Sequence, residues 1–428
     1  MKGIFTALAI LLLVSCKESS VQLAKPSTFV RYFNGGYSDQ AQNVIETSDK
    51  GFLILANTLI SQYQIKLIKT DAFGNQVWMK IYNDATGKAG YRGFGLAAIQ
   101  DANGNDSGYL IAGDSINGTT SSLMLIQVDQ NGTQATNSPM IKKGLNYQGV
   151  GVAWSKTKGD FFVVGQISAD APASSLNDSS MLFAQVDHTN LQHIVFSKKF
   201  GNGTGTLANR LYLDYSEQSA FWGGSVTYSN TGTPVTLGRF DKSGSGFNSQ
   251  IVGFDLTIGN STAYASPGYS STYSDLSPYG FGYVFVGSRS ANGTNNYDRI
   301  LTARLSPDGT ALDTVSSFKL INSTNKTNST VAQTVLPGNS ICSTQDGGLL
   351  ILGTIFVDQA GTNTDYYLIK VDAFGKQQWK NQQGGKYIDT GVKVLQASDG
   401  GYIVLGTTTL ANVPTILLMK TDLEGNIQ

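Results

Sequence analysis

Apolar residues along this chain gather in short continuous runs that follow glycine-containing turns. Three runs are closely similar, at residues 52–56, 349–353 and 402–406, and each comes directly after an Asp-x-Gly triplet. A short apolar run bounded by turn residues is typical of a β-strand that is buried on both faces. The aspartate accepts a hydrogen bond from the backbone two residues on, and glycine tolerates the tight turn. The pattern therefore predicts hairpins whose second strand is buried.

A second motif follows each of these runs. Residues 67–74 read Leu-Ile-Lys-Thr-Asp-Ala-Phe-Gly, and residues 368–375 and 418–425 repeat this order closely. The Asp-x-x-Gly end predicts a further hairpin, in which glycine adopts a positive φ. Each copy then consists of four strands, which in the first copy are expected at residues 43–47, 52–57, 63–70 and 76–82.

Weaker copies of the same unit fill the middle of the chain. The apolar run recurs at residues 109–113, 161–165, 221–224 and 283–287, which makes seven copies spaced by roughly 50 to 65 residues. Four-stranded units at this period predict an all-β fold, a seven-bladed β-propeller. Eight blades are an alternative, if residues 254–320 contain two units, and a β-sandwich array is another.

The two ends of the repeat region predict how the propeller closes. The seventh copy stops at Gln428, just after its turn between the third and fourth strands, while residues 28–33 form a strand without a partner ahead of the first copy. We expect residues 28–33 to be the fourth strand of the last blade. Such a closure removes an exposed sheet edge.

The first residues predict export and lipid attachment. Lys2 precedes an apolar run from Ile4 to Val14 that is short for a membrane span, so residues 1–15 are interpreted as a signal peptide. The segment Leu-Val-Ser-Cys that ends at Cys16 resembles the lipobox of bacterial lipoproteins. That resemblance implies lipidation of Cys16, a tether at residues 16–27 and a propeller at residues 28–428.

Two further resemblances concern the source and location of the protein. Residues 17–20 resemble the charged tag of surface-exposed lipoproteins of the Bacteroidota, and the repeats at residues 34–428 resemble those of propeller-type lipoproteins in that phylum. They imply a lipid-anchored protein of the outer membrane, exposed at the cell surface; the periplasmic leaflet is the alternative. The repeat resemblance says little about activity, because propellers serve many unrelated functions.

Charge and motif content argue against several functions. The 30 basic and 30 acidic residues balance, so the composition gives no electrostatic case for nucleic-acid binding. Sequence motifs for a nucleophile elbow, a phosphate-binding loop or a zinc protease are absent. Three carboxylates near predicted inner strands, Glu46, Asp214 and Asp389, are the candidates for a hydrolytic pair. We nevertheless expect a protein that is not an enzyme and has no cofactor.

One segment resembles a calcium-binding loop. Asp101, Asn103, Asn105 and Asp106 offer oxygen atoms at nearly alternate positions, which suits Ca²⁺. The segment lacks the distal bidentate glutamate and stands where other copies have a short turn. An expanded hairpin turn is therefore favoured over a metal site. His188 and His193, the two histidines of the chain, are interpreted as strand residues because no further His or Cys cluster accompanies them.

Four tyrosines interrupt the repeat pattern between residues 260 and 283. Tyr264, Tyr269, Tyr273 and Tyr279 are interleaved with Ser, Pro and Gly. Aromatic side chains on a polar loop suit stacking on sugars or packing in a protein interface. They are the candidate binding residues, although the segment is also compatible with the inner strand of the fifth blade.

These features predict a non-catalytic binding or scaffold lipoprotein. The expected partners are other outer-membrane or extracellular proteins, as in an accessory subunit of a membrane complex. Glycan binding through the tyrosine-rich segment is the first alternative, and a carbohydrate-active propeller enzyme is the second.

Overall fold

The computed structural model describes strands and turns in fourteen separate stretches of the chain. These are residues 27–118, 120–142, 147–167, 181–200, 207–213, 219–225, 235–243, 246–254, 269–280, 282–291, 297–305, 318–322, 338–357 and 362–427. Within these stretches every regular element is a β-strand, and no helix is long and apolar enough to cross a membrane. The predicted all-β class is confirmed.

The described strands form seven antiparallel sheets of four strands each. We call each sheet a blade and number the blades by their place in the chain. The first three blades are β2(Ser38–Glu46), β3(Phe52–Leu59), β4(Tyr63–Thr70) and β5(Gln76–Tyr82); β6(Gly90–Gln100), β7(Asp106–Asn117), β8(Thr120–Asp129) and β9(Met140–Lys142); and β10(Tyr147–Ser155), β11(Asp160–Ile167), β12(Met181–Asp187) and β13(Ile194–Phe200).

The remaining four blades follow the same order, except that the last one borrows a strand from the start of the chain. They are β14(Leu207–Leu213), β15(Ser219–Ser225), β16(Val235–Ser243) and β17(Gly246–Phe254); β18(Tyr269–Tyr279), β19(Gly282–Ala291), β20(Tyr297–Leu305) and β21(Phe318–Asn322); β22(Gly338–Ser343), β23(Leu349–Phe356), β24(Thr364–Val371) and β25(Gln377–Gln383); and β26(Asp389–Gln396), β27(Tyr402–Leu410), β28(Val413–Thr421) and β1(Phe29–Phe33).

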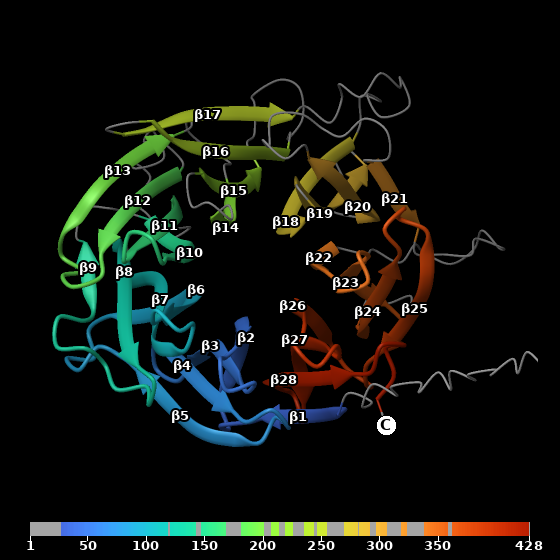
Figure 1. Ribbon diagram of the computed structural model, residues 1–428. Coiled ribbons are helices and arrows are strands. Elements are labelled where there is room, and N and C mark those ends of the chain that lie inside the picture. Colours follow the sequence, from blue (N-terminus) through green and yellow to red (C-terminus); the bar gives the residue numbers. More distant parts are fainter. Residues whose placement is uncertain are drawn as a thin grey trace, which may run out of the picture.

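The blades surround a common axis, as Figure 1 shows. The first strand of each blade is innermost and contacts the first strand of the next blade, and β26 contacts β2 to complete the circle. β1 pairs antiparallel with β28, from Phe29 opposite Lys420 to Phe33 opposite Ile416. The seven-bladed propeller closed by an N-terminal strand is therefore the observed fold, and the eight-bladed and sandwich alternatives are not.

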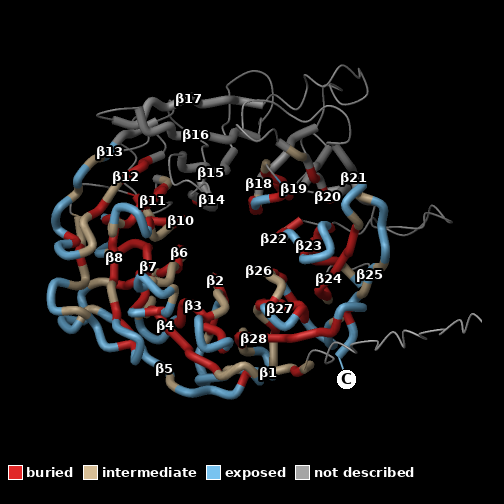
Figure 2. The backbone as a smooth tube through the Cα atoms, in the orientation of Figure 1, coloured by how far each residue is buried: buried red, intermediate tan, exposed pale blue. Residues whose placement is uncertain are grey.

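The core lies between neighbouring blades. In β3 every residue from Phe52 to Thr58 is buried, as the continuous apolar run predicted. The outer strands β5 and β25 are largely exposed, and Figure 2 shows this difference between the middle and the rim of each blade. Burial of the second and third strands against the adjacent blades stabilises the ring through the hydrophobic effect.

Each inner strand carries a β-bulge at the same place, and the sequence did not predict it. The pairing of each first strand with its second strand shifts by one residue, after Ala41, Gly93, Gly149, Ala208, Tyr273, Gly338 and Gly391. A bulge adds one unpaired residue and bends the strand. It also breaks the two-residue alternation, which is why the expected strand at residues 43–47 covered only the second half of β2.

A lysine on the third strand ties together both turns of its blade. In blade 1, Lys69 Nζ lies 2.9 and 2.8 Å from the two carboxylate oxygens of Asp49 and 2.8 Å from the carbonyl oxygen of Thr70. A Cβ atom on Gly51 would lie 2.5 Å from that nitrogen, so the glycine of Asp-x-Gly makes room for the lysine. We call this arrangement the turn clamp. It recurs as Lys370–Asp346 and Lys420–Asp399.

An aromatic residue on the fourth strand covers the Asp-x-x-Gly turn of the following blade. Phe29 of β1 lies opposite Lys420, just as Trp379 of β25 lies opposite Lys370. A Cβ atom on Gly74 would lie 2.5 Å from the Phe29 ring, and one on Gly425 would lie 2.7 Å from the Trp379 ring. Phe29 therefore makes the contact expected of a fourth-strand residue, although it comes from the other end of the chain.

Candidate functional site

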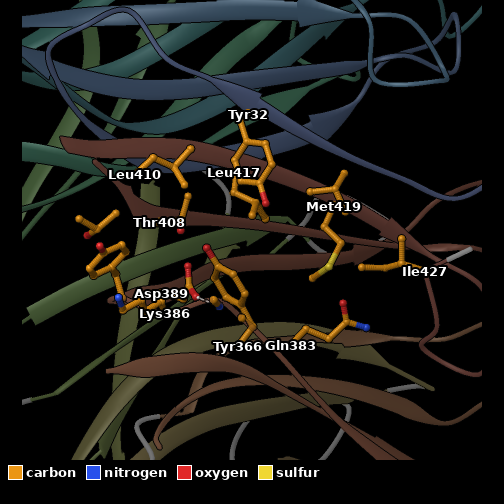
Figure 3. Close-up of a pocket in the computed structure, with 15 residues that line it drawn as sticks. Tyr32, Tyr366, Gln383, Lys386, Asp389, Thr408, Leu410, Leu417, Met419 and Ile427 are labelled. Atoms are coloured by element: carbon orange, nitrogen blue, oxygen red, sulfur yellow. Dashed lines mark hydrogen bonds between the residues drawn. The ribbon is translucent and has the colours of Figure 1, made fainter. Parts of the chain in front are cut away.

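A pocket of about 320 Å³ opens between blades 6 and 7. Its walls come from β24, from the end of β25 through the start of β26, and from β27, β28 and β1. Figure 3 shows how the labelled side chains from these elements surround it. The lining residues are Val30, Tyr32, Tyr366, Gln383, Gly384, Gly385, Lys386, Tyr387, Asp389, Thr408, Thr409, Leu410, Leu417, Met419 and Ile427.

Asp389, the first residue of β26, contributes a buried carboxyl group to this pocket. The residue is 2% exposed. Burial and the nearby charge of Asp365 raise the pKa of Asp389, against the opposing effect of hydrogen bonds from Thr408 and the Gly385 amide. That amide nitrogen lies 2.7 Å from Asp389 Oδ2. Among the residues that the structure describes, no cation forms an ion pair with Asp389.

A second carboxyl group, from Asp365 of β24, lies beside the first. A Cβ atom at Gly384 would collide with Asp365 Oδ1 and would lie 2.8 Å from Asp389 Oδ2, so both carboxyl groups flank this glycine. Asp365 Oδ2 accepts a hydrogen bond of 2.7 Å from Gln382 Nε2, while its buried Oδ1 has no hydrogen-bond partner. Two carboxyl groups so placed favour a cation or a shared proton between them.

The hydroxyl group of Tyr366 also points toward this site. Tyr366 is 1% exposed, and its hydroxyl oxygen is buried without a hydrogen-bond partner. Burial and the charge of Asp389 hold the pKa of this phenol well above its usual value, so the group is protonated. The ring passes over Gly406, where a Cβ atom would lie 2.7 Å from the Tyr366 hydroxyl oxygen. A buried hydroxyl group that lacks a partner is uncommon and calls for an explanation.

The remaining lining residues are apolar or aromatic side chains together with Gln383, Lys386, Thr408, Thr409 and two glycines. Leu410, Leu417, Met419 and Tyr32 lie on one side of the pocket in Figure 3. Tyr32 and Tyr387 line the pocket with about half of their surfaces exposed. Lys386 lies on the rim with its Nζ 5.9 Å from the centre of the Tyr387 ring. A small number of polar groups in an otherwise apolar pocket is the usual composition of a ligand site.

Three of the four predicted tyrosines are described by the structure, and these three do not line this pocket. Tyr264 lies outside the described residues, and Tyr269 and Tyr273 belong to β18, the inner strand of blade 5, as the structural alternative had it. Tyr279 ends that strand and is only 8% exposed. Its hydroxyl group lies 2.8 and 3.0 Å from the carbonyl oxygens of Gly347 and Ala373, so Tyr279 joins blades 5 and 6.

The candidate calcium segment forms the hairpin turn between β6 and β7. The amides of Asn103 and Asn105 donate to Asp101 Oδ1 at 2.8 and 2.9 Å. Asp106 is directed elsewhere, since its carboxylate accepts the Ser48 amide of blade 1 at 2.9 Å. The Asp101 carboxylate therefore holds the turn, and the Asp106 carboxylate joins blade 2 to blade 1.

One cluster of metal-ligand types was missed in the sequence. Asp160, Asp187 and His188 can bring one ligand atom each within 4.8 Å of one another. Asp187 accepts hydrogen bonds from the amide and hydroxyl of Thr189 at 2.8 and 2.7 Å. No second His or Cys cluster in the sequence marks this place, because the neighbour of His188 in space, Asp160, belongs to another strand.

The inter-blade pocket was only partly accessible to sequence reasoning. Asp389 was named as a carboxylate near an inner strand, but Asp365 and Tyr366 belong to a strand that resembles the core strands of other copies. Asp389 lies on another blade, so only the packing of blades 6 and 7 brings these groups together.

Comparisons with known proteins return likenesses to solved structures of low sequence identity. No family model matches it, and no curated protein does. Similar solved structures include an α-L-arabinofuranosidase of Fusarium graminearum (13% identity, 93% of this chain and 98% of that chain, TM-score 0.49) and an α-L-arabinanase of Penicillium chrysogenum (12%, 94% and 99%, TM-score 0.48). The β-propeller domain of a trilobed protease from Pyrococcus furiosus is another (9%, 90% and 93%, TM-score 0.47).

Proposed function

We propose that this protein is a non-catalytic binding lipoprotein of the outer membrane, and that the pocket between blades 6 and 7 is its ligand site. One observation carries the proposal. A buried carboxyl group, Asp389, faces an apolar pocket beside a second carboxyl group and a hydroxyl group without a partner. Burying such groups costs free energy unless they are paired, so a bound molecule would compensate for them.

The lipid anchor and the surface location are part of the same proposal. Their support is the lipobox at Cys16 and the short charged segment after it. Replacing Cys16 with Ser is expected to abolish incorporation of labelled fatty acid and to release the protein from the membrane fraction. Membrane retention of the Cys16→Ser protein would refute the anchor.

The proposed binding function is tested by purifying the native lipoprotein in mild detergent and measuring what accompanies it. A fixed set of outer-membrane proteins in near-equal amounts supports an accessory subunit. A protein that elutes alone argues against the subunit, and retention on polysaccharide columns then decides whether the ligand is a glycan. Exposed Tyr32 and Tyr387 at the pocket rim favour the glycan alternative, because aromatic rings stack on sugars.

The paired carboxyl groups also support a second candidate, a glycoside hydrolase. Such enzymes use two carboxyl groups, and a raised pKa suits the general acid. Asp389 has the raised pKa, and Asp365 is its neighbour. The low exposure of both residues, 2% and 9%, favours binding over hydrolysis. Release of reducing sugar from a polysaccharide panel by the native protein, and its loss in Asp389→Asn, would establish the enzyme instead.

A further inference from the structure

In blade 1 a buried lysine neutralises the aspartate that corresponds to Asp389. Lys66 Nζ lies 2.6 Å from both carboxylate oxygens of Asp39, and the two side chains are 3% and 0% exposed. The strand register puts the lysine there. Ala41, two residues after Asp39, pairs with Ala56 of β3, and Ala56 pairs with Lys66 of β4. An alkyl chain thus carries an ammonium group to this carboxylate.

Blade 7 has the same aspartate without the lysine. Gly391, two residues after Asp389, pairs with Gly406 of β27, and Gly406 pairs with Leu417 of β28. Leu417 therefore occupies the position of Lys66. It offers no charge to Asp389, and both residues line the pocket between blades 6 and 7. Blade 7 thus has the aspartate of blade 1 but a leucine at the position of the lysine.

Tyr366 gives independent support that a ligand belongs here. Its hydroxyl group is buried without a partner, in a residue that is 1% exposed and lines the same pocket. In Figure 3 this hydroxyl group and the Asp389 carboxyl group point to the same part of the pocket. The hydroxyl oxygen can accept a hydrogen bond from an N–H donor that also reaches Asp389.

We infer that this pocket binds a primary alkylammonium group, with the ammonium at Asp389 and the hydrocarbon chain along Leu417 and Met419. This inference rests on the proposed binding function and names the ligand class. An ammonium group has three donors, which is enough for the Asp389 carboxylate and the Tyr366 hydroxyl oxygen, both of which line the pocket. The source is either a free alkylamine or a lysine side chain of a partner protein, which share this chemistry.

The walls favour an organic cation over a metal ion. A hard divalent cation requires six or more oxygen ligands. In the described part of the pocket, Leu410, Leu417, Met419 and Tyr32 lie on the side opposite Asp389 and Tyr366, and the polar lining side chains are Gln383, Lys386, Thr408 and Thr409. Apolar walls accept a hydrocarbon chain, and tyrosine rings attract an ammonium group.

The test measures thermal unfolding of the purified full-length protein, in mild detergent at pH 7.5, with increasing n-butylamine. Butan-1-ol, which has the same chain length without a charge, is the control ligand. We expect a saturable rise in the unfolding temperature with the amine and none with the alcohol, because a ligand of the folded state stabilises it. Equal effects of the two compounds would overturn the inference, and so would stabilisation by CaCl₂ but not by the amine.

Two variants locate the effect. In Asp389→Asn the charge is lost with little change of shape, and amine affinity is expected to fall about tenfold or more. In Leu417→Lys the chain supplies its own ammonium group, as Lys66 does in blade 1, so amine binding is expected to disappear. If a folded Asp389→Asn protein binds the amine as tightly as the native protein does, the inference is wrong, whatever the result for Leu417→Lys.

The source of the amine is decided by comparing n-butylamine with N-α-acetyl-L-lysine methylamide. Tighter binding of the lysine derivative indicates a partner protein, and tighter binding of n-butylamine indicates a free amine. The proposed function is tested separately by co-purification. If neither amine binds the native protein, while stoichiometric partners accompany both the native and the Asp389→Asn protein, the ligand class is wrong and the binding function stands.

Discussion

At the scale of single residues, repeats of one sequence motif carry different charges at equivalent positions. Asp39 is paired with Lys66 in blade 1, whereas Asp389 in blade 7 faces Leu417 across a pocket. An aspartate kept without its cation is costly in the folded state unless something pairs with it. The candidate binding site is therefore indicated by the difference between two copies of the unit and not by the motif that they share.

Asp389→Asn is expected to stabilise the ligand-free protein at neutral pH, by about 1 kcal/mol. Since folding raises the pKa of Asp389, the folded state binds a proton more readily than the unfolded state does. This group therefore favours folding at low pH, and its contribution is lost as the pH rises through the raised pKa. Urea unfolding at pH 7.5 and at pH 4 measures the effect. The increase in unfolding free energy caused by Asp389→Asn should be smaller at pH 4 than at pH 7.5. A loss of stability in this variant at pH 7.5 would contradict the prediction.

At the scale of the blade, the turn clamp explains why the most regular copies combine Asp-x-Gly with Lys-x-Asp. Lys370 Nζ binds the Asp346 carboxylate of one turn and the Val371 carbonyl oxygen before the other, at 2.8 and 3.0 Å. Burial raises the pKa of Asp346, but hydrogen bonds from Lys370, Thr344 and Gly348 outweigh it and lower that pKa overall. Blade 3 has Gln185 in place of the lysine, and its amide binds Asp160 at 2.6 Å. Blade 3 thus keeps a hydrogen bond at this place without the ammonium charge.

Removing the aspartate of the turn clamp should cost more than removing its lysine. Asp346→Ala leaves the ammonium group of Lys370 buried without its anion, whereas Lys370→Met leaves a carboxylate that is 50% exposed to water. We expect a loss of about 2 kcal/mol for the first variant and about half of that for the second. Chemical unfolding measures the loss of unfolding free energy in each variant. A larger loss in Lys370→Met than in Asp346→Ala would show that the lysine acts through its packing alone.

The clamp also predicts a pH dependence. Because folding lowers the pKa of Asp346, its contribution to stability is present at neutral pH and is lost as the pH falls through the lowered value. The difference in unfolding free energy between the native protein and Asp346→Ala should therefore narrow below pH 4. A constant difference from pH 7 to pH 3 would contradict the electrostatic origin of the clamp.

At the scale of the whole molecule, the ring depends on a strand that lies far from its partner in sequence. β1 completes blade 7 next to β28 and contacts blade 1 through Phe29, which is 6% exposed. The rings of Phe29 and Phe52 are 6.3 Å apart. Arg31 Nη2 also donates to Asn75 Oδ1 of blade 1 at 3.2 Å. One short strand thus joins the last blade to the first.

Phe29→Ala should destabilise the protein by about 3 kcal/mol, because it removes a buried aromatic side chain where the ring closes. Val77→Ala is the matched control, since Val77 lies on an outer strand of blade 1 and is 61% exposed. Thermal unfolding should show a lower midpoint for Phe29→Ala and little change for the control. Equal midpoints would mean that β1 contributes little to closure.

Much of the fold was accessible from the sequence because its causes are local. Apolar runs, turn glycines and turn aspartates act within a few residues of one another, so they predicted the hairpins, the repeat count and the closing strand. The inner-strand bulges were hidden because residues such as Gln42 and Val392 resemble ordinary strand residues.

The candidate site was decided by tertiary structure. Asp365 and Tyr366 come from blade 6, while Asp389 and Leu417 come from blade 7, and their contact depends on how the two blades pack. The free-energy cost of a charge or a hydroxyl group depends on its burial and on its partners in space. Neither can be deduced from the neighbouring residues in the sequence. The sequence by itself thus determined the repeating unit and the closure of the ring, and the packing of one blade against another determined where an anion stands without its cation.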